Sequence, residues 1–422
     1  MNDFFDKTYP VLDKIYPVLS SIVISSSIFL WSIEFGPNRY DVGINVYVSI
    51  IALIIYVPYI IRNFDPFPLI LSNTFFLYHI VWGGINGFDV RSTLTCILFS
   101  IYFYGVYYSI KISFNEKFFI FRKMILFFLI AQLSLQILQV FGLFLLYSST
   151  TIGQNGLLSI GATGFFSEGS HVAISIVPLM FVKDDHGRHI NLYSIIVIIC
   201  LILGPSSTAI LGAFLLFILL ILKVNSWRQI MAAALLIVGT LSLAVVGREI
   251  FHVHFFAPIA DRVWGIFQIL GGKIEPGVNL SSLVYANGIS MAWAGLKDIL
   301  GSGLGHFEIY YDQSISRHAI EKITHGVLNK DDGSSVVFKM IGEMGVLGLF
   351  LVVYFFFNCL MIINKYGDCI LSVVACFLIM AGIRSAGYFH GPYILSFALV
   401  GVLWQIGALW PRRPLNRENI PE

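Results

Sequence analysis

The apolar residues of this chain fall in long blocks that recur along nearly its whole length, separated by short polar segments. A bilayer core of roughly 30 Å needs about 20 apolar residues per helix. No strand-like alternation of apolar and polar residues persists for long, which favours a helical bundle over a barrel. The pattern predicts twelve helices, at residues 17–35, 44–61, 67–84, 92–112, 121–147, 165–182, 190–204, 206–222, 227–247, 336–363, 367–384 and 389–410.

Basic residues indicate how these helices are oriented. With the N-terminus inside, nearly all Lys and Arg outside the segment 248–335 fall on inner loops, and the short outer loops carry only Arg39, Arg91 and Arg384. Loops rich in Lys and Arg stay in the cytoplasm. Both termini are therefore expected in the cytoplasm, and the long segment 248–335 is expected outside.

The expected fold is all-α, a polytopic membrane bundle of about twelve transmembrane helices with one long outer loop. It divides into residues 1–247 with the first nine helices, the loop 248–335, and residues 336–422 with the last three helices and a tail. Two stretches of the loop are amphipathic, with apolar stripes at Ile259, Val263, Ile266 and Leu270 within Pro258–Leu270, and at Ile289, Trp293 and Leu296 within Ser281–Leu300. Helices of this type lie on the membrane or cover a cavity.

Composition agrees with this class, since 57% of the residues are hydrophobic and 12% are charged. The net charge of +2 is too small to indicate a nucleic-acid partner. The five cysteines lie in or beside apolar segments without metal-ligand spacing, so no disulfide and no cofactor is expected.

The stretch from Gly301 to Leu351 combines a glycine-punctuated polar loop with a membrane helix that carries Lys339 and Glu343 in its first turns. We interpret this stretch as the rim of an active site. Because the two charged residues are four positions apart, they share one face of the helix, and a simple ion pair is an alternative explanation.

Ionisable side chains also occur at the outward ends of other predicted helices. Such residues usually face a cavity or one another. Cations gathered without a nucleotide-binding glycine loop indicate a clamp for a diphosphate or a lipid headgroup, although snorkelling to anionic membrane lipid explains the same positions. The residues are Glu168, His171, Arg248, Lys339, Glu343, Arg384 and His390.

Glu168 stands where a predicted helix enters the membrane. It either caps the helix N-terminus or acts as a proton acceptor, and partial desolvation is expected to raise its pKa and favour the second role. The adjacent Asp331 and Asp332 are not accompanied by further clustered carboxylates, so no metal site is expected.

Several motifs follow one another in a characteristic order, and over about residues 160–400 they resemble the bacterial O-antigen polymerase and ligase superfamily, the polymerase (Wzy type) more closely. Ligases typically begin the last motif with His-Asn, where this chain has two serines. The motifs are Ser167-Glu-Gly-Ser170, Ser206-Ser-Thr-Ala-Ile-Leu-Gly212, Arg262-Val-Trp264, Trp293-Ala-Gly-Leu-Lys-Asp-Ile-Leu-Gly301-Ser-Gly-Leu-Gly-His-Phe307, Ser334-Ser335 and Gly345-Val-Leu-Gly348.

The resemblance implies a metal-independent glycosyltransferase of the bacterial inner membrane with a periplasmic active site. Its substrates would be glycan units on undecaprenyl diphosphate, joined into O-antigen or a related surface polysaccharide, and not nucleotide sugars. Membrane lipid and a chain-length regulator protein are the further partners it implies.

A transferase of this kind needs a base for the acceptor hydroxyl and fixed cations for the departing diphosphate. We expect Glu168 first and Glu343 second as the base. The alternatives are an O-antigen ligase, which transfers lipid-linked glycan to an acceptor, and a lipid or oligosaccharide transporter, whose internal repeat is not visible in the sequence. The residues expected to bind substrate are Arg248, Arg262, Lys339, Arg384, His171, His390, Ser334 and Ser335.

Overall fold

A computed structural model describes residues 2–35, 42–115, 118–143, 162–183, 191–204, 206–222, 257–273, 280–331, 333–366, 370–385 and 387–407. Regular structure in these ranges is almost entirely helical. The strands found there are one short antiparallel pair, β1 (Glu34–Phe35) and β2 (Val42–Gly43).

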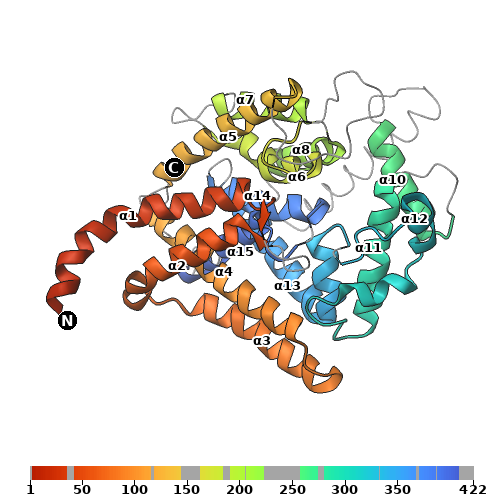
Figure 1. Ribbon diagram of the computed structural model, residues 1–422, viewed down its shortest axis with the longest axis horizontal. Helices are drawn as coiled ribbons and strands as arrows, with labels where there is room; N and C mark the ends of the chain where they lie inside the picture. The colour runs from red at the N-terminus through yellow and green to blue at the C-terminus, as the bar shows by residue number, and fades with distance from the viewer. Residues whose placement is uncertain are drawn as a thin grey trace.

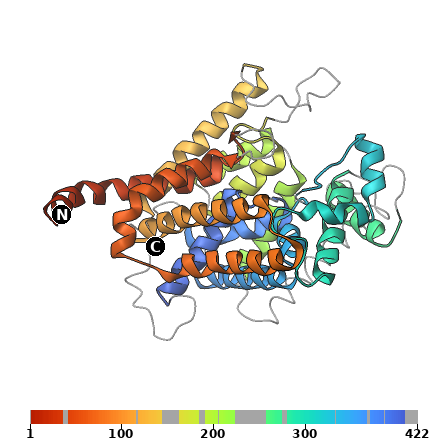
Figure 2. The same ribbon diagram turned by 60° about the horizontal axis from the view of Figure 1, so that its bottom comes forward.

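The first helices are α1 (Asn2–Phe29), α2 (Ile44–Arg62), α3 (Pro66–Asn86), α4 (Val90–Asn115), α5 (Phe119–Val140), α6 (Gly169–Ile176), the 3₁₀ helix η1 (Val177–Phe181), α7 (Leu192–Leu203) and α8 (Ser207–Leu222). The later ones are α10 (Ala257–Leu270), α11 (Leu280–Lys297), the 3₁₀ helix η2 (Phe307–Gln313), α12 (Arg317–Thr324), α13 (Val336–Tyr366), α14 (Ile370–Ile383) and α15 (Gly391–Gln405). Figures 1 and 2 show α10, α11 and α12 gathered at one side of the other helices.

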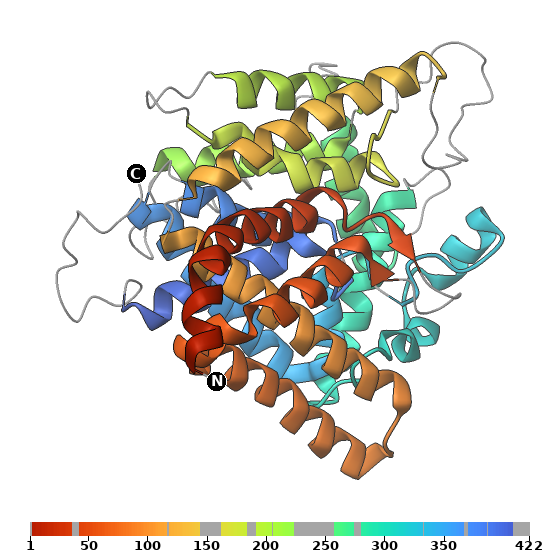
Figure 3. The ribbon, with the colours of Figure 1, turned by 60° about the vertical axis from the view of Figure 1, so that its left-hand side comes forward.

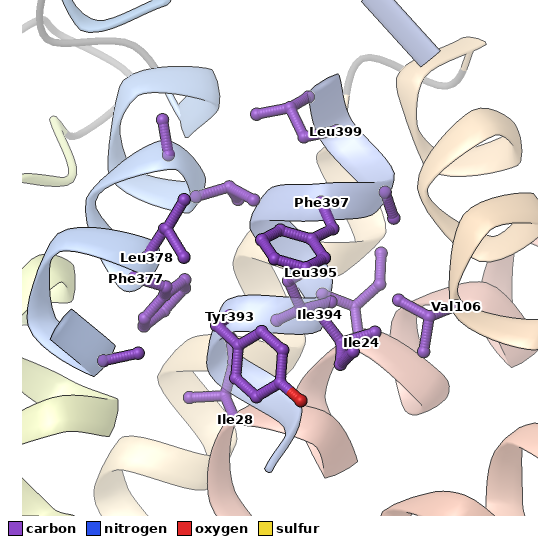
Figure 4. Packing of buried hydrophobic residues seen from close by; sticks show 14 of the residues in the cluster. Ile24, Ile28, Val106, Phe377, Leu378, Tyr393, Ile394, Leu395, Phe397 and Leu399 are labelled. Carbon is purple, nitrogen blue, oxygen red and sulfur yellow. The ribbon is translucent and has the colours of Figure 1, made fainter. Parts of the chain in front are cut away.

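Helices α14 and α15 form the centre of the bundle. Every residue from Ile370 to Ala381 and from Gly391 to Leu403 is buried. A helix that is apolar on all sides needs other helices around it, and α15 packs against α1, α3, α4, α13 and α14. The rings of Phe355 and Phe397 stack with their centroids 3.8 Å apart. Figure 4 shows Phe397 among apolar side chains of the neighbouring helices.

Peripheral helices bury one face and expose large apolar side chains on the other. Ile54 of α2 is 69% exposed and Phe127 of α5 is 62% exposed, which is the surface expected where a helix faces lipid. Helices α2, α3, α4, α5 and α13 are long and apolar enough to cross a bilayer. The chain is therefore a multi-pass helical membrane protein.

Other apolar helices in the described ranges are shorter, with 10–17 residues each. The predicted helix at 227–247 lies outside the described residues. The number of twelve spans thus stays a prediction.

Two regions differ from the predicted helices. Helix α1 begins at Asn2 instead of residue 17 and continues through Pro10 and Pro17. Residues 165–182 do not form one helix, because a non-helical stretch precedes α6 and Pro178 opens the separate helix η1. The nitrogen of Pro178 carries no hydrogen for the carbonyl one turn before it, which favours the change from α-helix to 3₁₀ helix here, although α1 accommodates its two prolines.

Both amphipathic stretches of the long loop form helices, α10 and α11. Helix α11 packs along α13, but it does so through small residues, with Gly288 against Phe338 and Gly295 against Gly342. Small side chains allow two helix backbones to approach closely. Trp293, on the predicted apolar stripe, is 58% exposed, so this stripe is not the side of α11 that contacts the protein.

Helix α13 is interrupted at Gly345, whose φ of 57° and ψ of −129° are not helical. The amide of Val346 donates to the carbonyl of Ile299 in the glycine-punctuated loop at 2.8 Å. A Cβ at position 345 would lie 1.9 Å from that carbonyl oxygen. The crossing of loop and helix therefore requires glycine at this position.

The same loop supplies hydrogen bonds to the turn before the break. The amides of Ser302 and Gly303 donate to the carbonyls of Gly342 and Glu343 at 3.0 and 2.9 Å. Backbone carbonyls that lose helical partners need others. The loop therefore fixes the first part of α13, which carries Lys339 and Glu343.

Candidate functional site

Glu168 lies just before α6, and side chains from two parts of the chain contact its Oε1. His171 Nε2 lies at 3.1 Å and Arg384 Nη2 at 3.4 Å, and the Ser170 hydroxyl donates to the same oxygen. Arg384 follows α14, which Figure 1 shows beside α6. The Glu168 side chain makes no capping hydrogen bond to α6 and is 43% exposed. Helix capping by its side chain therefore does not explain this residue.

The polar contacts of Glu168 determine the protonation state of its carboxyl. Burial raises the pKa of this carboxyl, but the charges of His171 and Arg384 together with the Ser170 hydroxyl lower it below its usual value. The expectation of a raised pKa is therefore wrong, because the contacts with His171, Arg384 and Ser170 outweigh burial. The carboxyl is ionised at neutral pH, which is the form that accepts a proton.

The indole of Trp31 lies beside both predicted histidines, with its ring centroid 4.7 Å from that of His171 and 4.1 Å from that of His390. Ser385 Oγ lies 2.7 Å from His390 Nδ1, and the Gly387 amide donates to the same nitrogen at 3.3 Å. Because Nδ1 accepts the bond from the amide, the imidazole proton of His390 is on Nε2.

Lys339 and Glu343 form the ion pair that their spacing allows, with Lys339 Nζ 3.7 Å from Glu343 Oε1. This distance is too long for a hydrogen bond. Lys339 Nζ donates instead to the carbonyl of Asp331 at 2.8 Å and lies 5.4 Å from the centroid of the Tyr388 ring. The Glu343 side chain is completely buried and that of Lys339 is 11% exposed. Lys339 thus connects α13 with the end of the outer loop.

Ser334 and Ser335 lie beside the end of α14. Ser335 forms a parallel bridge with Ser385, and the Ser385 amide donates to the Ser334 carbonyl at 3.0 Å. The Ser335 hydroxyl donates to the Gly382 carbonyl at 3.0 Å and accepts from the Val337 amide at 3.2 Å. It therefore caps α13 and joins the start of α13 to the end of α14.

Tyr285 of α11 meets the same end of α14, where its hydroxyl donates to the Gly382 carbonyl at 3.2 Å. Burial raises the pKa of this hydroxyl to about 12, although the charge of Arg384 opposes the shift. The hydroxyl is therefore protonated at neutral pH. Helix α11 of the long loop thus contributes a hydrogen-bond donor beside the predicted residues.

Most of the predicted site residues come together at the ends of α6, α13, α14 and α15. Arg248 lies outside the described residues, and Arg262 lies in α10 at a position whose side chain is not described. Trp31, Ser385 and Tyr388 were not predicted, because no motif marks them. We use the name Glu168 cluster for Glu168, His171, Lys339, Glu343, Arg384 and His390.

A second polar group connects the outer loop with the turn between α3 and α4 and with the first turn of α4. Asp89 Oδ2 lies 3.0 Å from His306 Nε2, and Arg91 Nη1 lies 2.7 Å from Glu308 Oε1. Partial burial raises the pKa of Asp89, but the Ser92 amide and His306 outweigh it, so that the pKa is lowered. These contacts hold the loop onto the bundle.

The Glu168 cluster combines an ionised carboxylate, a guanidinium, imidazoles and a lysine. Such a set can accept a proton and stabilise negative charge at the same place. Comparison with known proteins assigns no family to the chain: no protein-family model matches it, and no curated protein matches it.

Proposed function

We propose that this protein is a glycosyltransferase that polymerises undecaprenyl-diphosphate-linked oligosaccharide repeat units at the periplasmic face of the bacterial inner membrane. The product is O-antigen or a related surface polysaccharide. The observation that carries the proposal is the contact of the Glu168 carboxylate with Arg384 and His171 at a partly exposed position.

The reaction needs a donor that is available outside the cytoplasm, where no nucleotide-sugar pool exists. A lipid-linked donor meets this need, and its diphosphate is the leaving group. Cations that are already fixed in the protein stabilise the charge that develops there. Arg384 and Lys339 belong to the Glu168 cluster, and Arg248 and Arg262 are proposed to complete the cation set.

In the proposed step, the oxygen of an acceptor hydroxyl forms a bond to the anomeric carbon of the donor. The bond from this carbon to the diphosphate oxygen breaks, and undecaprenyl diphosphate leaves with the electron pair. Glu168 accepts the hydroxyl proton. Arg384 turns toward the diphosphate on binding, which frees the carboxylate and raises its basicity.

Polymerase is favoured over ligase by the two serines that stand where ligases have His-Asn. Ser335 caps α13 and is completely buried, which supports a structural task for this position. The ordered motifs from Ser167 to Gly348 support the same family-level proposal.

The test is deletion of the gene in a Gram-negative host that makes O-antigen from lipid-linked units. Polymerase loss leaves a separate ligase able to attach one unit, so the gel should show lipid A core plus a single repeat and no ladder. Bare core with accumulated lipid-linked polymer would indicate a ligase instead. Absence of both single-repeat core and lipid-linked polymer would indicate a transporter.

Glu168→Gln keeps the shape of the side chain and removes the base. It should copy the deletion, with at least about a 100-fold loss of polymer and normal protein in the membrane. Glu321→Gln is the matched control, because Glu321 pairs with Arg317 on α12 of the outer loop, and it should leave the ladder intact. A normal ladder in Glu168→Gln would move the role of base to Glu343.

A further inference from the structure

Three glutamines of α5 lie on one face of this membrane helix. Gln132, Gln136 and Gln139 are four and three positions apart, which aligns them along the helix. The side chains of Gln132 and Gln136 are completely buried. Polar side chains inside a membrane bundle usually bond to neighbouring helices, but these contact the backbone of the non-helical segment that leads to Glu168.

The contacts of Gln132 and Gln139 use both ends of each side-chain amide. Gln132 donates to the Thr163 carbonyl at 3.0 Å and accepts from the Phe165 amide at 2.8 Å. Gln139 accepts from the amides of Thr163 and Gly164 at 2.7 and 2.8 Å and donates to the Gly164 carbonyl at 3.3 Å. A glutamine amide carries the same donor and acceptor as a peptide group, so it can replace the neighbouring strand that this segment lacks.

Gln136 attaches the start of the segment to α7. Its Nε2 donates to the carbonyls of Ala162 and Cys200 at 2.7 and 3.1 Å, and the Ala162 amide donates to the Leu203 carbonyl at 3.2 Å. Figure 3 shows α5, in gold, running beside α7, in yellow-green, and the two helices are in contact. The segment is therefore held between one helix face and the end of another.

Every backbone amide from Ala162 to Ser167 has a partner. The Phe166 amide donates to the Thr163 carbonyl at 3.1 Å, and the Ser167 amide donates to Ser32 Oγ at 3.0 Å. Non-helical backbone at membrane depth is tolerated only where protein groups satisfy it. Such complete pairing of an irregular segment fixes the residue that follows it, Glu168.

Gly164 makes the close approach possible. Its φ is +62°, and a Cβ at this position would lie 2.3 Å from Gln132 Oε1. A side chain would therefore separate the segment from α5.

We infer that Gln132, Gln136 and Gln139 are positioning residues: their amides hold Ala162–Phe165 against α5 and thereby place Glu168 beside Arg384. The inference deepens the proposed function and rests on it for the role of Glu168. The fixing of the segment itself does not depend on any activity.

The experiment uses the full chain in lipid nanodiscs and compares Gln132→Met and Gln139→Met with wild type. Methionine keeps the length of the side chain and removes both hydrogen-bonding groups. Ser134→Ala is the control, because the exposed Ser134 hydroxyl donates to the carbonyl of Ile130 in its own helix, and no bond to another described segment is found. Gln139→Glu retains the acceptor for two amides and tests rescue.

Amide hydrogen exchange of peptides covering 162–168 is measured first. The Met variants should exchange about fivefold faster there, because one hydrogen bond is worth about 1 kcal/mol, and peptides of α4 should be unchanged. Polymerisation turnover should fall by about tenfold with the KM for the lipid-linked donor within about twofold. Gln139→Glu should lie closer to wild type in both measurements.

Unchanged exchange in both Met variants would overturn the inference. Faster exchange with wild-type turnover would also overturn it, provided that Glu168→Gln is inactive. If Glu168→Gln keeps full activity, the proposed base is wrong, and the exchange data still decide whether the glutamines hold the segment. Should a Met variant fail to accumulate, recovery of protein and exchange protection in Gln139→Glu supports the inference, and loss of both in Gln139→Glu refutes it.

Discussion

Two carboxylate–cation pairs, Asp65–Lys111 and Glu168–Arg384, each have their carboxylate at the N-terminal end of a helix, but they are built differently. Asp65 precedes α3 and is completely buried, with Lys111 Nζ 3.1 Å from its Oδ2. Glu168 precedes α6 and is 43% exposed, with Arg384 Nη2 3.4 Å from its Oε1. Similar charges are thus enclosed in one place and accessible in the other.

Asp65 has all of its partners within the protein. Its carboxylate accepts from the Phe67 amide at 3.0 Å and from the Tyr107 hydroxyl, and its own amide donates to the Tyr108 hydroxyl at 3.1 Å. A buried charge that is fully bonded fixes structure and leaves no group for a ligand. The Glu168–Arg384 distance is longer and the pair is more exposed than Asp65–Lys111. Moving Arg384 from Glu168 to a substrate phosphate therefore costs less free energy than breaking the Asp65 pair would. The difference separates a structural pair from a candidate catalytic pair.

The largest expected effect is all-or-none and concerns the side of the membrane on which the outer loop lies. Asn63 and Gln313 are both exposed, and the proposed topology puts them on opposite sides. In a background without native cysteines, Gln313→Cys should react with an impermeant maleimide on intact spheroplasts, and Asn63→Cys should react only after permeabilisation. The reverse pattern would place the Glu168 cluster in the cytoplasm and contradict the proposed function.

Arg384→Ala should reduce polymer by about 100- to 1,000-fold, because a fixed cation at the leaving group is lost. Arg384→Lys should recover only part of the activity, since the planar fork of donors is missing. Lys111→Ala is the matched variant of the enclosed pair. Its polymer yield per molecule of protein should stay within about twofold, as measured by gel and by immunoblot. Equal losses in Arg384→Ala and Lys111→Ala would remove the distinction between the two pairs.

Asp65→Ala should lower the free energy of unfolding by about 3–5 kcal/mol, because Lys111 is left partly buried without its counter-ion. Glu168→Ala should lower it by no more than about 1 kcal/mol, since its pair is partly solvated. Thermal unfolding in detergent measures both. A larger loss in Glu168→Ala would mean that Glu168 serves stability.

The smallest effect is expected from Asp89, whose side chain is 39% exposed. Its pKa is lowered in the fold because the Ser92 amide and His306 outweigh burial. Its stabilising contribution is therefore present above the unfolded pKa and is lost as the pH falls through the folded pKa. Asp89→Asn should lower stability by less than about 1 kcal/mol at neutral pH. The difference from wild type should disappear in acid, and a difference that persists there would exclude this cause.

The sequence predicted the helices better than the contacts between them. The helix predicted at 44–61 is observed at Ile44–Arg62, because a long apolar block specifies it locally. The break before α6 was missed, since the partners of that segment are glutamines far away in the chain. The predicted cluster of Glu168 with Arg384 depended on the predicted topology, which puts both residues at outward helix ends, whereas Trp31 and the lowered pKa of Glu168 depend on contacts across the bundle.

The interruption of α13 at Gly345 makes the order of assembly matter. In the proposed topology, the loop residues Ile299–Gly303 are synthesised first and exported before α13 enters the membrane. Until they dock, the carbonyl of Gly342 lacks the Ser302 amide as its partner, and an unpaired carbonyl in hydrocarbon costs several kcal/mol. Helix α13 can then be completed only after the loop has been exported and has docked. A chain whose loop stays inside would never assemble the surroundings of Lys339.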